Sequence, residues 1–256
     1  MNSVIEHYND LLAPIYLWMT GGAGAALNQG AAELASFNVS HTTGAVAVDL
    51  GAGFGMHAIP LARLGYDVTA VDSSRLLLSQ LQQLSKDEGH DIHAIEADVL
   101  DFATHVYGPV AVVLCMGDTL THLSSTDGVE RLCAQVAACL APGGRFIVTF
   151  RDYCRPPRGD DRFIPVRSDS GRIHTCFLEE RGDGLLVHDI VHERQGDTWT
   201  TRVGHYPKLR LAPDNIVARL EQLGLSVTRD CGPSGMVRIA AVRRSLTRSK
   251  IRAGGG

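Results

Sequence analysis

Three glycines at alternate positions follow a short apolar segment near residue 50. The sequence AVDLGAGFG, from Ala47 to Gly55, places glycine at positions 51, 53 and 55. Glycine adopts backbone conformations that are closed to other residues, and it lets the chain pass against a ligand with no side chain between them. A helix after Gly55 would also point its N-terminal amides at that ligand. The spacing therefore predicts a ligand-binding turn.

Two acids downstream of the turn narrow the choice of ligand. Asp72 ends VTAVD, about 20 residues after the first glycine, where a carboxylate would accept hydrogen bonds from ribose hydroxyls. Asp98 follows the next apolar segment in HAIEADVLDF, where it could accept a hydrogen bond from an adenine amino group. Met56 stands at the third glycine of the dinucleotide fingerprint G-x-G-x-x-G, which makes a nicotinamide cofactor less favoured. An adenosine-bearing ligand fits these features.

Alternating apolar and amphipathic stretches between residue 46 and about residue 150 position these groups. Strands that alternate with helices over short connections form a parallel sheet with crossover helices, which predicts a doubly wound α/β fold. Ligands then lie at the carboxyl ends of the strands. The predicted strands are VAVDL, DVTAV, DIHAIEA, VAVVLCM and GRFIVTF, and the predicted helices follow Gly55, begin at Ser73 or Ser74, and run from Ser124 to Leu140.

The pattern changes to an alternation of polar and apolar residues between about 151 and 210. RIHTCFLEE, LLVHDIVHE and TWTTRVGHY predict three antiparallel strands, joined by hairpin turns at RGDG and QGD. We expect this meander to cover the ligand-binding edge of the parallel sheet. A helix over APDNIVARLEQLGL and the strands SVTRD and MVRIAAVRR would complete the fold.

Together, VDLGAGFG, VTAVD and EADVLDF resemble the class I S-adenosylmethionine-dependent methyltransferases. The later segments CMGDTLTHL, PGGRFIVTFRDY and GHYPKLRLAPDNI are similar in type and order to parts of the glycine, sarcosine and dimethylglycine N-methyltransferases. The resemblance implies a Rossmann-like α/β fold with a mostly parallel seven-stranded sheet, an antiparallel β lid insertion, and S-adenosyl-L-methionine as cofactor. It implies an N-terminal helical cap (1–45), a cofactor-binding core (46–150 and 211–244), a substrate lid (151–210) and a flexible tail (245–256).

The resemblance also assigns the expected site residues. In those enzymes the arginine after the fifth strand holds the substrate carboxylate, and Arg151 in FRDY stands at the matching position. A guanidinium fork suits a carboxylate because two parallel charge-assisted hydrogen bonds fix its direction. We expect Tyr8, Tyr16 and Trp18 to fold over the cofactor, and His205 and Tyr206 to line the substrate chamber. The candidate catalytic residues are Asp118, His122, Arg151 and Tyr206, and the candidate cofactor-binding residues are Tyr16, Asp49, Gly51, Ala52, Gly53, Asp72, Ser73, Asp98, Val99 and Cys115.

The chain departs from that family at Asp118, which stands in GDTLTHL where the family carries asparagine. A carboxylate stabilises a protonated ammonium group, which has no lone pair with which to attack a methyl group. Neutralising an amine of pKa near 10 at pH 7 already costs roughly 4 kcal/mol. Asp118 would add to that cost unless it also removes the proton. A family tyrosine pair is also replaced around Pro165 and Val166, so simple glycine is not the expected substrate.

The leading functional hypothesis is methyl transfer to a small molecule, at an amine nitrogen of a carboxylate-bearing compound. An O- or S-methyltransferase of small metabolites on the same fold is the first alternative. The second alternative is a nicotinamide-dependent oxidoreductase or a noncatalytic nucleotide-binding module. The acceptor, the number of methyl transfers and the oligomeric state, including homo-oligomers, stay open at this point.

Composition limits the other classes of function. The 256 residues are 45% hydrophobic and 20% charged with a net charge of -4, which is typical of a globular chain and gives no electrostatic footprint for nucleic acid. No apolar run approaches the roughly 18 residues of a membrane span, so we expect a cytoplasmic protein. Six cysteines without a C-x-x-C pair indicate reduced thiols rather than disulfides or zinc. His188 and His192 come nearest to a metal pattern but have the wrong order for H-E-x-x-H, and no metal is expected.

Overall fold

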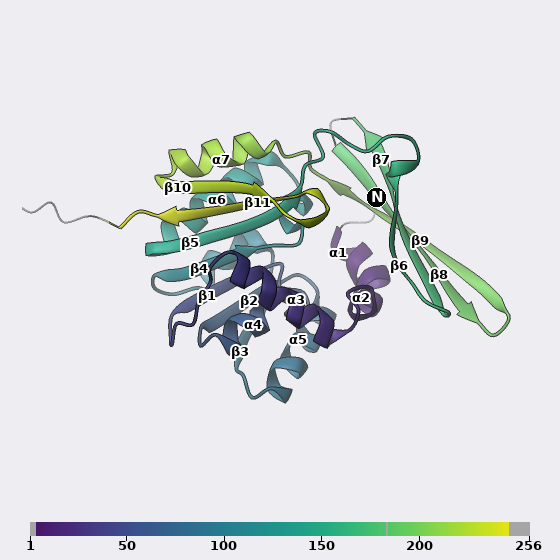
Figure 1. Ribbon diagram of the computed structural model, residues 1–256, viewed down its shortest axis with the longest axis horizontal. Coiled ribbons are helices and arrows are strands. Elements are labelled where there is room, and N and C mark those ends of the chain that lie inside the picture. The colour runs from purple at the N-terminus through teal and green to yellow at the C-terminus, as the bar shows by residue number, and fades with distance from the viewer. Residues whose placement is uncertain (1–3, 183, 246–256) are drawn as a thin grey trace, which may run out of the picture.

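Two β-sheets lie side by side in the computed structural model, which describes residues 4–182 and 184–245 (Figure 1). The central sheet has seven strands in the order β10-β11-β5-β4-β1-β2-β3, and the second has four strands in the order β6-β7-β8-β9. The predicted fold class is confirmed: an α/β chain with a mostly parallel seven-stranded sheet and a separate antiparallel sheet.

The strands of the central sheet are parallel except for β11, which runs against both of its neighbours. The buried residues of these strands are apolar on both faces of the sheet, as expected where helices cover both faces. Val48, Val113 and Phe146 are fully buried. The bounds are β1 (Val46–Leu50), β2 (Asp67–Asp72), β3 (Ile92–Glu96), β4 (Val110–Cys115), β5 (Leu140–Arg151), β10 (Leu225–Cys231) and β11 (Met236–Arg243).

Strand β5 begins earlier than the sequence predicted. The predicted strand GRFIVTF begins at Gly144, but the residues from Leu140 to Gly143 also lie inside β5, where the register with β4 shifts between Val110 and Val112. A β-bulge accommodates the extra residues without ending the strand.

Helices cover the two faces of the central sheet in separate groups. Helices α3, α4 and α5 pack in one hydrophobic cluster, and α6 and α7 pack in the other. Ser74 caps α5 and Ser125 caps α6, each accepting a hydrogen bond from an amide in the first turn of its helix. The bounds are α3 (Ala23–Ser36), α4 (Ala58–Arg63), α5 (Arg75–Asp87), α6 (Thr126–Cys139) and α7 (Pro213–Gln222), with short helices η3 (Val99–Thr104), η4 (Thr119–His122), η5 (Gly159–Arg162) and η6 (Pro233–Gly235).

The second sheet contains one strand more than the three predicted. Strand β6 was missed because it is a short edge strand with Pro165 in it and an irregular register, features that weaken a strand pattern. The pairing of the other three strands is as predicted, although the RGDG turn includes residue 183, which lies outside the described residues. The bounds are β6 (Phe163–Ser168), β7 (Arg172–Arg181), β8 (Gly184–Gln195) and β9 (Thr198–Lys208).

The N-terminal segment packs between the two sheets (Figure 1). Leu12 joins a cluster with Leu178 and Val187 of the second sheet, and Ala13 packs with Phe54 next to the glycine turn. Among the described residues, no helix is both long and apolar enough to cross a membrane. Residues 246–256 of the predicted tail lie outside the described part of the chain. The segment contains α1 (Val4–His7), η1 (Tyr8–Leu12), η2 (Ala13–Ile15) and α2 (Tyr16–Met19).

Candidate active site

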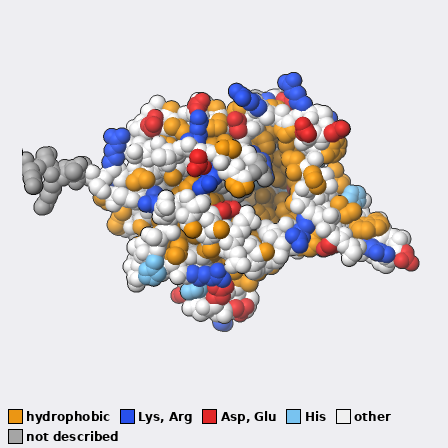
Figure 2. Space-filling model, in the orientation of Figure 1, with side chains coloured by type: hydrophobic (Ala, Val, Ile, Leu, Met, Phe, Trp, Pro, Cys, Tyr) orange, Lys and Arg blue, Asp and Glu red, His pale blue; other side chains and the backbone are white. Residues whose placement is uncertain are grey.

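A cavity of about 320 Å³ lies at the carboxyl ends of β1, β2, β3 and β4. Figure 2 shows the surface hollowed between the two sheets, with hydrophobic side chains around the hollow. The N-terminal segment supplies part of the wall through Val4, Ile5 and Tyr8. Nine of the predicted site residues line this cavity: Tyr16, Gly51, Ala52, Gly53, Asp72, Ser73, Asp98, Val99 and His122.

At Gly51, the backbone conformation and the lack of space explain why the turn requires glycine. Its φ of +74° is one that residues with a side chain rarely adopt, and a Cβ there would lie 2.5 Å from the Thr119 side chain. The amide of Gly53 donates to Asp72 Oδ2 at 2.8 Å, so it positions the acid instead of facing the cavity. The turn is therefore tied directly to the end of β2.

Asp72 is held from two sides at the cavity wall. Its Oδ1 accepts a hydrogen bond from the amide of Ser74 at 2.8 Å, and its Oδ2 accepts the one from Gly53. Burial raises the pKa of this carboxyl above its ordinary value, although the backbone hydrogen bonds oppose that change. Each carboxylate oxygen keeps a second lone pair for a hydroxyl donor.

Asp98 caps a short helix and also lines the cavity. Its Oδ1 accepts the amide of Leu100 at 2.8 Å and so caps η3, while the residue also lines the cavity. Ala97, Val99 and Leu100 line the cavity beside it. An apolar wall next to a carboxylate suits a flat heteroaromatic ring that carries an amino group.

The other end of the cavity is lined by polar groups without charge. Tyr8 Oη and His122 Nε2 lie 3.3 Å apart, Tyr16 lines the cavity near them, and Thr119 lines it next to the glycine turn. Burial, followed by the nearby Lys208 charge, lowers the pKa of His122 to about 3, so its imidazole is neutral at physiological pH. Burial also raises the pKa of Tyr16 to about 12, which keeps its phenol protonated.

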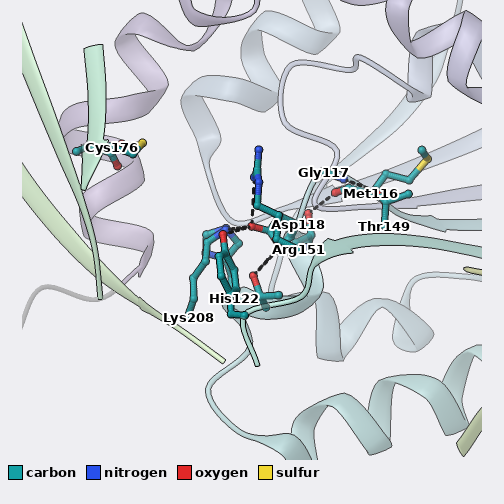
Figure 3. Close-up of polar contacts among 12 residues, drawn as sticks. Met116, Gly117, Asp118, His122, Thr149, Arg151, Cys176 and Lys208 are labelled. Atoms are coloured by element: carbon teal, nitrogen blue, oxygen red, sulfur yellow. Dashed lines mark hydrogen bonds and ion pairs between the residues drawn. The ribbon is translucent and has the colours of Figure 1, made fainter. Parts of the chain in front are cut away.

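Asp118 does not line the cavity, and its carboxylate is fully engaged elsewhere. Lys208 Nζ and Tyr153 Oη donate to Oδ2, the latter at 3.0 Å, while the Arg151 amide donates to Oδ1 at 2.9 Å (Figure 3). Thr121 Oγ1 also donates to Oδ1, at 3.1 Å. Burial favours the protonated carboxyl, but the Lys208 charge and these hydrogen bonds outweigh it and lower the pKa of Asp118.

Four more predicted site residues also lie outside the cavity lining. Arg151 places Nη1 3.6 Å from Asp118 Oδ2, and its side chain is 44% exposed. Tyr206 is buried in the second sheet, where its ring stacks on His122 at 5.1 Å. Asp49 lies beneath the glycine turn, where burial raises its pKa to about 6, and Cys115 is fully buried in the core.

Neighbouring residues Tyr206 and His205 point to opposite faces of β9, because side chains alternate along a strand. His205 contacts His188, with ring centroids 5.5 Å apart, and does not line the cavity. Lys208 shares the face of Tyr206, and sequence reasoning missed it. The same alternation, applied two residues beyond Tyr206, is the signal that would have placed it.

Known proteins match the central part of the chain in sequence and nearly all of it in fold. A family model described as a methyltransferase domain matches residues 47–144, which include the glycine turn, Asp72, Asp98 and His122. A solved S-adenosylmethionine-dependent methyltransferase from Clostridium acetobutylicum superposes with a TM-score of 0.72 at 13% identity, covering 93% of this chain and 99% of that one. Residues 47–144 thus match a methyltransferase domain, and the chain has the fold of this solved methyltransferase.

Curated relatives of this methyltransferase domain differ in the atom that they methylate. The chain is 26% identical over 106 residues to a glycine/sarcosine N-methyltransferase of Halorhodospira halochloris, covering 41% of this chain and 40% of the relative. It is 35% identical over 101 residues to a ubiquinone biosynthesis O-methyltransferase of Caulobacter sp. (strain K31), covering 40% of this chain and 38% of the relative. The match thus spans about two fifths of each relative's length.

The cavity of the methyltransferase domain fits an S-adenosyl ligand. The turn at Gly51 leaves no room for a Cβ, Asp72 offers lone pairs to hydroxyls, and Asp98 stands beside an apolar wall. Arg151, Tyr206 and Lys208 come after the matched residues and are contributed by β5 and the second sheet.

Proposed function

We propose that this protein transfers a methyl group from S-adenosylmethionine to the neutral amine nitrogen of a small molecule that carries an acidic group. Gly51 and Gly53 form the turn against which the cofactor would lie, Asp72 would accept its ribose hydroxyls, and Asp98 would accept its adenine amino group. The bound sulfonium supplies an already activated methyl group. The residues of this chain then have to hold the acceptor in line and keep water out.

The absence of free negative charge at the acceptor end carries the proposal for an amine. The lining side chains Tyr8, Tyr16, Thr119 and His122 are neutral, and the nearby Asp118 charge is balanced by Lys208. The other nearby carboxylates accept hydrogen bonds, Asp72 from backbone amides and Asp189 from two histidines and Cys176. A desolvated site without a carboxylate disfavours a bound ammonium ion and favours the neutral amine, which has the lone pair needed for attack. The neutral His122 imidazole can accept a hydrogen bond from an amine N–H without becoming protonated.

The position of Arg151 favours an acceptor that carries an acidic group. Asp118 forms its hydrogen-bonded ion pair with Lys208, whereas Arg151 Nη1 approaches the same carboxylate only to 3.6 Å. With one carboxylate beside two cations, this region keeps a positive charge. The half-exposed guanidinium of Arg151 remains able to form a bidentate contact with a carboxylate or phosphate.

Matched acceptor pairs test the proposal. The protein is incubated with S-adenosylmethionine labelled in the methyl group and with 2-amino acids, the 2-hydroxy acids of the same carbon skeleton, and catechols, and the products are read by mass. We expect label in amino compounds, with turnover that rises with pH as the acceptor amine loses its proton. The identity to the Caulobacter O-methyltransferase makes oxygen the second candidate. Label confined to the hydroxy acids or catechols would establish that alternative and contradict the amine proposal.

A further inference from the structure

Three potential metal ligands meet on the inner face of the second sheet, outside the cavity. His174 and Cys176 are two residues apart on β7 and therefore share one face of the strand. Asp189 on β8 stands directly opposite Cys176 in the pairing register. His7, the last residue of α1, reaches the same carboxylate from the N-terminal segment.

The nitrogen of His174 and the sulfur of Cys176 both contact one oxygen of Asp189. His174 Nε2 lies 2.7 Å and Cys176 Sγ lies 3.0 Å from the same oxygen, Asp189 Oδ1, and these two atoms are 3.8 Å from each other. All three lie within 4.8 Å of one another. His7 Nε2 contacts the other oxygen, Asp189 Oδ2, at 2.7 Å. His7, His174 and Asp189 are each no more than 2% exposed.

We propose that His174, Cys176 and Asp189 bind a divalent transition-metal ion of the Zn²⁺ type, with His7 orienting the Asp189 carboxylate. One nitrogen, one sulfur and one oxygen ligand form a donor set that Zn²⁺ accepts, and tetrahedral bonds of about 2.0 to 2.3 Å require ligand atoms roughly 3 to 4 Å apart. Small shifts of the three side chains meet that requirement. Three protein ligands leave one of the four usual positions for a further donor.

Charge balance favours an ion at this position. A buried carboxylate needs a compensating charge, and the described hydrogen-bond partners of Asp189 are two imidazoles and a thiol. On metal binding, the Cys176 thiol would lose its proton to solvent and the His174 Nε2 lone pair would face the ion.

His174 would bind the ion through Nε2, which places its ring proton on Nδ1. That nitrogen is buried and has no hydrogen-bond partner among the described residues, so it leaves the Nε2 lone pair to be directed by the ion alone. A bound ion would also fix His7, and His7 is followed by Tyr8, which contacts His122 across the cavity. The site would thus hold the N-terminal segment in place. This proposal stands apart from the methyl-transfer proposal, because its test measures metal binding.

Titration of the full chain with Co²⁺ and Zn²⁺ tests the site. The protein is first treated with a chelator, and Co²⁺ is then added while the thiolate-to-cobalt charge-transfer absorption is followed. We expect about one equivalent to bind per chain, with the band lost on addition of Zn²⁺. Cys176→Ser should abolish the band, His174→Gln should weaken binding at least tenfold, and His7→Gln should weaken it about tenfold, as for a group that orients a ligand.

Cys154→Ser provides the matched control, because Cys154 is an exposed cysteine outside the cluster. This variant should bind Co²⁺ as the parent does. The proposal is overturned if the parent shows no charge-transfer band at one equivalent, or if the band survives Cys176→Ser, and the three side chains then form a closed hydrogen-bond network only. Should His174→Gln fail to fold, Cys176→Ser decides alone, since it retains both imidazole contacts with Asp189.

Discussion

Lys208, the last residue of β9, donates a hydrogen bond to Asp118, which follows β4 in the other sheet. The two side chains are 5% and 2% exposed, so this ion pair is buried where the two sheets meet. Asp118 has a left-handed backbone with φ of +77°, which turns its carboxylate toward β9 and β5. The pair therefore joins the sheets and balances the negative charge of Asp118 beside the cavity.

Lys208→Met should strongly destabilise the protein. Removing one partner of a buried ion pair leaves an uncompensated charge, which costs about 3 to 5 kcal/mol of unfolding free energy. The double variant Lys208→Met/Asp118→Asn should recover a large part of that loss, because neither charge remains. Urea denaturation at pH 7.5 measures both. As a control, Arg75→Met breaks an exposed ion pair with Glu96 and should leave the urea midpoint almost unchanged. A double variant less stable than Lys208→Met would contradict the account of the pair.

Asp72→Asn should weaken binding of S-adenosylhomocysteine by more than tenfold. A hydrogen bond to a charged group is worth about 1.5 to 3 kcal/mol, and the substitution removes the charge that would receive the ribose hydroxyls. Calorimetric titration gives the affinity. Asp67→Asn, at the exposed start of the same strand, is the control and should bind normally. An unchanged affinity in the Asp72 variant would remove this residue from the cofactor site.

Gly51→Ala should lower cofactor affinity and stability together. The new Cβ would meet the Thr119 side chain at 2.5 Å, in a backbone conformation that alanine rarely adopts. Gly24→Ala is the matched control, because that glycine lies in α3, has no atom within 4 Å of an added Cβ, and should become slightly more stable as alanine. Thermal melts with and without S-adenosylhomocysteine report both effects. Equal behaviour of the two variants would show that the turn tolerates a side chain.

Arg151→Lys should raise the KM for the acceptor, or lower kcat/KM, by tenfold or more. Lysine keeps the charge but loses the planar fork that binds an acidic group in two places. The affinity for S-adenosylhomocysteine should stay nearly constant, since Arg151 does not line the cofactor cavity. Steady-state kinetics with the best amine acceptor measures the change. Normal turnover by the lysine variant, or an acceptor without any acidic group, would leave Arg151 with a structural role through its contacts with Asp118 and Tyr153.

His122→Asn should make the protein more resistant to acid. The pKa of His122 is 6.5 in the unfolded chain and about 3 in the folded one, so the unfolded state binds the extra proton first. Stability is then lost as the pH falls below 6.5, by about 3 kcal/mol at pH 4.5, at 1.4 kcal/mol per pH unit. The difference in unfolding free energy between variant and parent should therefore move in the variant's favour between pH 7.5 and 4.5. A difference that does not change with pH would contradict a buried neutral imidazole.

The local pattern of the sequence was enough to predict the central sheet and the meeting of the glycine turn with two acids at its edge. Apolar strands, serine caps and the glycine spacing depend on residues close together in the chain, and parallel strands bring their carboxyl ends to one edge. The turn at Gly51, Asp72 and Asp98 therefore meet as the sequence predicted. Strand β6 lacked such a pattern, since its partner β7 and its proline at an edge position define it only in three dimensions.

Only the tertiary structure decided the partners of the charged and titratable side chains. Asp118 and Lys208 are 90 residues apart in the chain, and His7 and Asp189 are 182 apart, so no spacing rule connects them. The sequence indicated the chemistry of each group, but its charge state depends on burial and on what lies within about 4 Å. For this reason Asp118, predicted at the site from its place in GDTLTHL, is an ion-pair partner beside the cavity, and His174, Cys176 and Asp189 form a cluster that no local motif indicated.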